Sequence, residues 1–280
     1  MRVVNTDIIT SNIKEMCIDA NLRLTPDMEQ SLKKSLQNED SALGKQILEQ
    51  LEINLDIAAK ESIPICQDTG MTIIFIKIGQ EVHFEGEFLE NAINEGIRQG
   101  YKEGYLRKSV VNDPIIRNNT NDNTPGIIHY EFTQGDKIEI TVAPKGFGSE
   151  NMSRIYMLKP SDGKEGIKKA VLETVQLAGP NACPPIVVGV GIGGSFEKST
   201  ILAKKALLRN VNECSKENHI KELEEELLEE INNLGIGPGG LGGKTTALGV
   251  NIETYPTHIA GMPVAINICC HVNRHVSRII

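Results

Sequence analysis

The first sixty residues have the spacing of apolar side chains that is typical of helices. Ile13, Cys17 and Ala20 recur every three to four residues, which is the period of one helix face. Thr25-Pro26-Asp27 is a characteristic helix start, with proline in the first helical position. The pattern predicts a helical N-terminal region of two or three helices over about residues 1–62.

A strand pattern follows. Residues 71–78 are rich in β-branched side chains and predict a buried strand. Residues 127–142 alternate on both sides of Gly135-Asp136, which predicts a β-hairpin. Helical spacing returns between them, over residues 86–106.

The second half alternates helices and strands. We expect a helix from Gly163 to Ala178, a strand at 186–190, and then a glycine turn and a helix that runs through Leu208. Residues 215–234 predict an acidic amphipathic helix that Gly235 ends, with a solvated charged face. No internal repeat or low-complexity linker interrupts the chain. The expected fold is therefore α+β, a single domain over residues 1–280 built as a helical region followed by a mixed α/β unit.

Composition excludes several classes of protein. The 280 residues are 40% hydrophobic and 24% charged, which is enough to bury a core. No apolar run is as long as a membrane span, roughly 18 residues, and the N-terminus has no secretory core, so we expect a cytoplasmic protein without membrane partners. A net charge of −8 disfavours a nucleic-acid surface. Small molecules and proteins are the expected partners.

Two glycine motifs resemble nucleotide sites. Gly189–Gly194 matches G-x-G-x-x-G after an apolar run, but no acidic residue follows on a second strand. Gly243-Lys244-Thr245 resembles the end of a P-loop, but Pro238 occupies the position of its first glycine. A nucleotide-dependent oxidoreductase therefore stays only as an alternative hypothesis.

The six cysteines include no C-x-x-C pair, so a zinc ribbon is unsupported. Cys17 belongs to an apolar stripe, and Cys214 lies in the polar segment that leads to the acidic helix; we interpret both as non-ligands. Cys66, Cys183 and Cys270 stand among proline, glycine or polar residues, where side chains can be held toward a shared pocket. Spacing alone leaves structural thiols, zinc and an iron-sulfur cluster as open interpretations.

Six motifs follow one another over nearly the whole chain. They are Cys66-Gln67-Asp68-Thr69-Gly70, Gly148-Ser149-Glu150-Asn151, Ala182-Cys183-Pro184-Pro185, Gly189 to Gly194, Gly237 to Gly243 and Pro256-Thr257-His258-Ile259-Ala260-Gly261. In this order they resemble the alpha subunit of class I fumarate hydratases. The same family includes the alpha subunit of L-tartrate dehydratase, and these motifs do not separate the two. The beta subunit, a C-terminal domain in longer members, lies beyond the resemblance.

This resemblance implies a 4Fe-4S cluster with one open iron that acts as a Lewis acid. Its implied ligands are Cys66, Cys183 and Cys270. Cys270 is preferred to Cys269 because the third cysteine of the family follows the His258 motif at this distance.

The resemblance also implies roles for side chains around the cluster. Asp68 matches the acid/base residue, although it could instead cap a turn or orient Gln67. A dianionic substrate needs cationic partners, and arginine binds a carboxylate through two parallel hydrogen bonds; Arg107 matches the family position, with Arg117 as a rival. The implied substrate-binding residues are Gln67, Arg107, Gly148 and His258.

Together these features predict the alpha subunit of an iron-sulfur hydro-lyase that interconverts fumarate and L-malate. A beta subunit is expected to complete the active site in an oligomer. An L-tartrate dehydratase alpha subunit is the alternative. A non-catalytic iron-sulfur scaffold is a further alternative, against which Asp68, Gln67 and Arg107 argue because they accompany the three cysteines.

Overall fold

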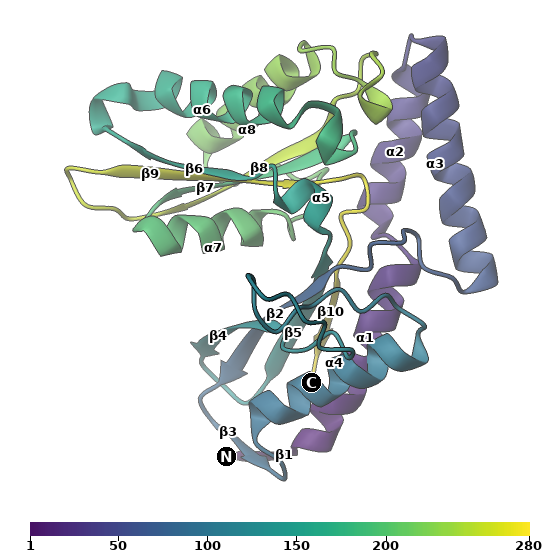
Figure 1. Cartoon of the computed structure of the whole chain (residues 1–280). Helices are drawn as coiled ribbons and strands as arrows, with labels where there is room; N and C mark the ends of the chain where they lie inside the picture. Colours follow the sequence, from purple (N-terminus) through teal and green to yellow (C-terminus); the bar gives the residue numbers. More distant parts are fainter. The chain divides into compact units, whose positions relative to one another are not determined.

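The computed structural model describes residues 1–280, and its contacts divide the chain into two compact units (Figure 1). Unit 1 comprises Met1–Thr25, Leu55–Phe147 and Arg274–Ile280, and unit 2 comprises Pro26–Asn54 and Gly148–Asn273. Both mix helices with a β-sheet, which confirms the α+β class. None of the helices combines the length and apolarity needed to cross a bilayer.

Unit 1 is built on a four-stranded sheet in the order β10-β5-β2-β4. Strands β1 and β3 form a separate, two-stranded parallel sheet. The strands are β1 Arg2–Asn5, β2 Met71–Gly79, β3 Val82–Glu85, β4 Ile127–Thr133, β5 Ile138–Lys145 and β10 Val276–Ile279.

The predicted hairpin at Gly135-Asp136 is wrong. Both strands exist, but β2 lies between them, parallel to β4 and antiparallel to β5. The physical reason is the burial of β2 along nearly its whole length. Buried backbone N–H and C=O groups on both edges of a strand need hydrogen-bond partners, so β2 has a neighbouring strand on each edge. Local alternation identified the strands and could not identify their partners.

Helices α1 (Thr6–Leu22) and α4 (Leu89–Glu103) form a core with this sheet. The two helices can approach closely because Gly100 has no side chain; a Cβ there would lie 2.8 Å from the carbonyl oxygen of Lys14. Cys17 is fully buried in this core, and burial raises the pKa of its thiol to about 12. It is a packing residue, as its apolar stripe indicated.

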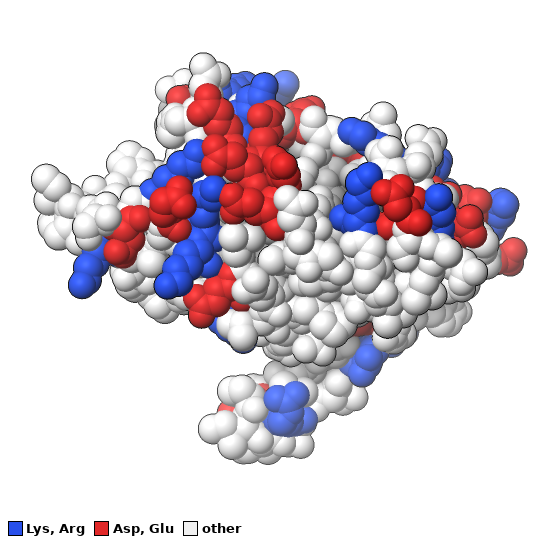
Figure 2. Space-filling model, turned by 90° about the horizontal axis from the view of Figure 1, so that it is seen from above, with Lys and Arg blue, Asp and Glu red and all other residues white.

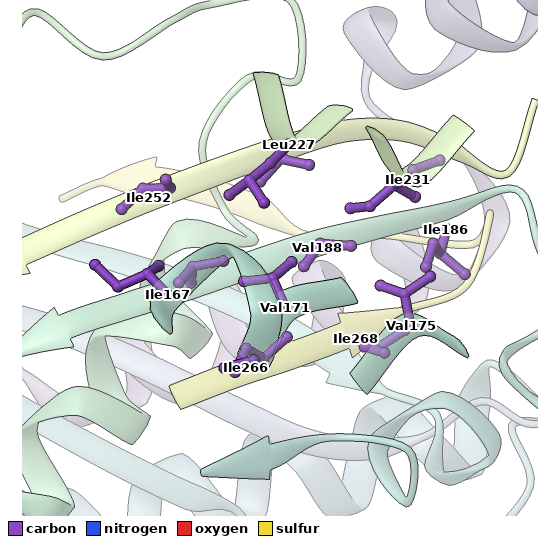
Figure 3. Close-up of a cluster of buried hydrophobic side chains, with 14 of the residues drawn as sticks. Ile167, Val171, Val175, Ile186, Val188, Leu227, Ile231, Ile252, Ile266 and Ile268 are labelled. Atoms are coloured by element: carbon purple, nitrogen blue, oxygen red, sulfur yellow. The ribbon is translucent and has the colours of Figure 1, made fainter. Parts of the chain in front are cut away.

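Unit 2 contains a second four-stranded sheet, in the order β6-β9-β7-β8. Helices α6 and α8 cover one face and α7 covers the other (Figure 1). Figure 3 shows the core on the first of these faces, where Val171 of α6 and Leu227 of α8 meet Val188 and Ile266 of the sheet. The elements are β6 Arg154–Leu158, α6 Gly163–Ala178, β7 Ile186–Gly193, α7 Phe196–Ala206, α8 Asn218–Asn232, β8 Ala247–Tyr255 and β9 Met262–Cys269.

Two further helices confirm the helical N-terminal prediction: α2 (Pro26–Asn38) belongs to unit 2, and α3 (Ala42–Glu61) contains the boundary between the units. Short helical segments complete the chain. They are α5 Phe147–Glu150, η1 Pro160–Asp162, η2 Gly179–Ala182 and η3 Pro238–Gly240.

The glycines of the dinucleotide-like motif have a packing role. Gly189 lies inside β7, within the strand predicted at 186–190, and Gly191 also lies in β7 and not in the glycine turn that was expected after residue 190. A Cβ at Gly191 would overlap the carbonyl oxygen of Ser199, and one at Gly189 would overlap that of Ala203. Helix α7 therefore lies directly on the glycine backbone of β7, which accounts for these two glycines without a nucleotide.

The acidic face of α8 is solvated, as predicted, and some of its carboxylates form ion pairs. Lys164 Nζ lies 2.7 Å from Glu226 Oε1, and Lys168 Nζ lies 2.5 Å from Glu230 Oε1. Figure 2 shows acidic and basic side chains side by side on the face of the molecule seen from above. Such exposed pairs contribute little to stability.

Candidate functional site

In unit 1 the loop that carries Cys66 joins α3 to β2. Cys66 is half-buried, and its Sγ lies 3.3 Å from Gln67 Oε1, to which it donates a hydrogen bond. The hydroxyl of buried Thr69 donates to the carbonyl oxygen of Arg107 at 3.0 Å. The structure thus brings the Arg107 segment to the same loop, with the Gln67 and Arg107 side chains exposed.

The carboxylate of Asp68 is held by two backbone N–H groups. Gly70 donates to Oδ1 at 3.0 Å and Phe147 donates to Oδ2 at 2.9 Å. A Cβ at Gly146 would lie 3.1 Å from Oδ2, so glycine leaves room for the carboxylate there. Asp68 does close a turn, as one interpretation expected. A carboxylate has about four acceptor positions, so these bonds leave capacity for a proton.

Two buried polar side chains, Tyr101 and Asn123, hold the Cys66–Gly70 loop by hydrogen bonds to its backbone. Tyr101 Oη donates to the carbonyl oxygens of Thr69 (2.8 Å) and Gly70 (3.0 Å). Burial raises the pKa of Tyr101, which keeps this hydroxyl a donor. The amide of buried Asn123 donates to Gly70 at 3.2 Å, while its oxygen accepts from Ser109 N at 2.7 Å. The loop is therefore held by side chains that a motif search does not select.

Arg274 is the functional candidate that the sequence analysis missed. Its guanidinium donates from Nη2 to the carbonyl oxygen of Asp68 at 2.5 Å and from Nε to that of Pro144 at 3.4 Å. The side chain is 3% exposed, and its Nη1 is buried without a hydrogen-bond partner. No motif or periodicity singles out this arginine, so only the fold could reveal it.

In unit 2, Cys183 and Cys270 belong to segments that the structure brings together. Cys183 is exposed after η2 in a left-handed conformation (φ 53°), and Cys270 is half-buried directly after β9. Nδ1 of His271 lies 3.2 Å from the carbonyl oxygen of Cys183, within hydrogen-bond distance. Cys269, by contrast, is 3% exposed as the last residue of β9. Cys270 is thus the more accessible of the adjacent pair.

The glycine-rich run packs against the Cys183 segment. Gly239 N donates to the carbonyl oxygen of Pro184 at 2.8 Å. A Cβ at Gly240 would lie 2.7 Å from Cα of Pro180, and Gly240 has φ 74°. The run therefore needs glycine for two reasons, its positive φ and its close approach to the Cys183 segment.

The P-loop-like segment binds a carboxylate of its own chain. Glu39, 1% exposed between α2 and α3, accepts from the backbone N–H groups of Asp40, Ser41, Lys244 and Thr245 at 2.9–3.1 Å. Burial by itself raises the pKa of Glu39, but these four donors outweigh it and hold the pKa below its ordinary value. An internal anion therefore occupies the position that the motif suggested for a phosphate.

The remaining predicted residues lie in exposed segments of unit 2. His258 Nδ1 accepts from Ala260 N at 3.1 Å, so its hydrogen bonds stay within its own turn. Gly148 is exposed in α5. Cys66 belongs to one unit and the other two predicted cysteine ligands to the other, and in neither unit by itself do three His, Cys, Asp or Glu side chains gather as metal ligands.

Comparison with known proteins identifies the class. A model of the fumarate hydratase (fumerase) family matches residues 10–278. A protein of Methanocaldococcus jannaschii named putative L(+)-tartrate dehydratase subunit alpha is 44% identical over 273 residues, covering 95% of both chains. The L(+)-tartrate dehydratase subunit alpha of Escherichia coli K12 is 33% identical over 255 residues, covering 90% of this chain and 84% of its own.

These matches extend over nearly the full length of the chain. The chain belongs to the fumarate hydratase (fumerase) family, a family of hydro-lyases.

Proposed function

We propose that this chain is the alpha subunit of an iron-sulfur hydro-lyase acting on a four-carbon dicarboxylate. The observation that carries the proposal is the near full-length similarity to alpha subunits of L(+)-tartrate dehydratase. Because relatives at 44% and 33% identity have that name, L-tartrate, dehydrated to oxaloacetate, is the first substrate to test. Fumarate, hydrated to L-malate, is the second, and the family name supports it.

Cys66, Cys183 and Cys270 are the proposed ligands of a 4Fe-4S cluster. Thiolates are the ligands that iron-sulfur clusters require. Cys66 lies in a loop, Cys183 and Cys270 directly follow η2 and β9, and all three have at least part of the side chain exposed. A buried arginine without a counter-ion beside the Cys66 loop also suits an anionic group. When bound, the cluster supplies one open iron as a Lewis acid for the substrate hydroxyl. The assignment requires the sulfur atoms of both units to converge.

Asp68 is the proposed acid/base residue. In the dehydration direction its carboxylate takes the proton from the carbon next to a substrate carboxylate, and in the hydration direction it returns the proton. The bonds from Gly70 N and Phe147 N fix its two oxygens during this transfer. Because the carboxylate is already oriented, it does not have to change its rotamer before it accepts the proton.

Substrate carboxylates need donors, which the exposed groups of the candidate site supply. Arg107 offers two parallel hydrogen bonds to one carboxylate, and Gln67 offers an amide beside it. The backbone N–H of Gly148 and the imidazole of His258 are the proposed remaining contacts. All four residues are exposed, so a substrate can reach them without a rearrangement of the chain.

A beta subunit is the proposed partner, because the relatives are named as alpha subunits. We expect it to complete the active site in a hetero-oligomer located in the cytoplasm. The isolated alpha chain should then bind a cluster and have little or no turnover.

The test is anaerobic reconstitution with iron and sulfide, with and without a co-expressed beta subunit. L-tartrate and fumarate are supplied in parallel, and oxaloacetate and malate are measured. A 4Fe-4S cluster with turnover only in the presence of beta supports the proposal, and the preferred product names the substrate. Cys66→Ser should lose the cluster, whereas Cys214→Ser, a matched change at an exposed cysteine outside the site, should retain it. A cluster without turnover of either compound would favour the scaffold alternative.

A further inference from the structure

Two buried carboxylates elsewhere in the chain have partners that compensate their charge. Glu224, 4% exposed, accepts from Arg209 Nη2 at 2.9 Å. Glu39 accepts from four backbone N–H groups. Buried charges in proteins are usually satisfied in one of these ways, since removing a charge from water without a partner is costly.

Arg274 departs from this rule. A guanidinium has five N–H donors in a planar fork and stays charged in proteins. Here only two carbonyl oxygens accept from it, those of Asp68 and Pro144, and neither is charged. Nη1 is buried with no partner at all. A positive charge at 3% exposure thus lacks its counter-ion.

The position of this charge is informative. Asp68, whose carbonyl oxygen Arg274 binds, is two residues from Cys66 and is the proposed acid/base residue. Pro144 lies near the end of β5, three residues before Phe147, which donates to the Asp68 carboxylate. Arg274 therefore binds both segments that orient the Asp68 carboxylate, the Cys66–Gly70 loop and the end of β5.

We propose that Arg274 is an anion-binding and positioning residue of the site at the Cys66–Gly70 loop, and that its missing counter-ion is an anion that binds there. The inference rests on the proposed function, which supplies two such anions: the thiolate-bound iron-sulfur cluster and a substrate carboxylate. Both carry the negative charge that Arg274 lacks, and both provide acceptors that Nη1 can bind once the atoms that cover it shift on anion binding. The bound anion would also stabilise the arginine that fixes the Asp68 backbone.

The test compares three variants of the full chain, each co-expressed with the beta subunit. Arg274→Gln removes the charge and keeps hydrogen-bond donors for the carbonyl oxygens, while Arg274→Lys keeps the charge. Arg278→Gln is the matched control, because Arg278 lies four residues further on and is paired with Glu15 and Asp19 at 2.6 and 2.9 Å. For each variant we would measure iron content, cluster reduction potential, KM and kcat.

The two sources of the anion give different results. If the cluster is the counter-ion, Arg274→Gln lowers the iron content and shifts the reduction potential to more negative values, because a positive charge favours the reduced cluster; Arg274→Lys restores the potential. If the substrate is the counter-ion, Arg274→Gln raises KM by about tenfold or more at an unchanged potential, and Arg274→Lys recovers part of the loss. The proposal is overturned if Arg274→Gln matches Arg278→Gln in iron content, potential and KM. It is also overturned if both Arg274 variants fail to fold, since Arg274 would then be a structural residue.

Failure of the proposed function has a different signature, because wild type itself would then hold no cluster and show no turnover. The inference is tested in that case with inorganic phosphate as the probe anion and the melting temperature as the readout. Phosphate should stabilise wild type and Arg278→Gln more than Arg274→Gln. An equal response of all three proteins would contradict an anion site at Arg274.

Discussion

The loops that carry Cys66 and Cys183 are held in different ways. The Cys66 loop is fixed by long side chains from elsewhere in unit 1, with Tyr101 and Arg274 donating to its carbonyl oxygens. The Cys183 segment is fixed by backbone, since glycines 239 and 240 lie directly against its prolines. Side-chain hydrogen bonds can be removed one at a time, whereas close backbone packing tolerates no added atom. The two loops should therefore respond differently to mutation.

Asp68→Asn should have the largest effect, and it acts mainly on the chemistry. The amide oxygen can still accept from Gly70 N, while the bond from Phe147 N is lost, so the loop should keep most of its contacts. Loss of a general acid/base residue typically lowers kcat by about 10²- to 10⁴-fold. We expect unchanged iron content with kcat reduced to this extent, measured on the reconstituted heteromer. Normal turnover in this variant would remove the acid/base assignment.

Gly240→Ala should have the largest effect on stability and should act on the Cys183 segment. The new Cβ would overlap Pro180 at a backbone φ of 74°. Overpacking plus left-handed strain predicts a loss of about 2–4 kcal/mol in the free energy of unfolding, measured by denaturant titration. Gly242→Ala is the control, because φ there is 84° but no atom lies within 4 Å of the added Cβ. Equal losses in the two variants would mean that strain, and not packing, requires the glycine.

Glu39→Gln should weaken the attachment of Lys244 and Thr245 to the turn between α2 and α3. Charge-assisted hydrogen bonds from four backbone donors are replaced by weaker neutral ones, so we expect a loss of about 2 kcal/mol near neutral pH. Glu49→Gln, at an exposed position of α3, should change the free energy of unfolding little.

The effect of Glu39 should depend on pH. Its pKa in the folded chain lies below the ordinary value of 4.5, so the folded state binds fewer protons than the unfolded state between the two values. The stabilisation is fully present above the ordinary pKa and is lost as the pH falls through the lower pKa of the folded state. The stability difference between wild type and Glu39→Gln should therefore shrink on acidification below about 4.5. A difference that stays constant as the pH falls well below 4.5 would contradict a charged Glu39.

Tyr101→Phe should have the smallest effect and should act on the Cys66 loop. It removes the hydroxyl hydrogen that the carbonyl oxygens of Thr69 and Gly70 share, and it leaves the ring in the core. We expect a loss of about 1–2 kcal/mol in unfolding experiments, together with faster amide exchange in residues 65–70. Tyr105→Phe, at a side chain that is 90% exposed, is the control. Unchanged exchange in Tyr101→Phe would mean that Asn123 and Arg274 suffice to hold the loop.

Much of the secondary structure could be predicted because its signals are local. Proline at the start of α2 and glycine after α8 mark helix ends through their own φ preferences. The run of β-branched residues in β2 similarly identifies a buried strand. The partner of β4 and β5 could not be predicted in the same way. Both strands pair with β2, which comes about fifty residues earlier in the chain than β4.

The candidate site divides along the same line. The sequence by itself determined the family, the cysteine motifs and the Cys66-Gln67-Asp68 segment, because these are short strings whose residue types state their chemistry. Only the tertiary structure decided that Glu39 accepts from the backbone of Lys244 and that Arg274 holds the carbonyl oxygen of Asp68 as a buried charge without a counter-ion. Each of these contacts joins residues more than 200 positions apart. Burial and hydrogen-bond partners of that kind depend on how distant segments pack, and no local pattern records them.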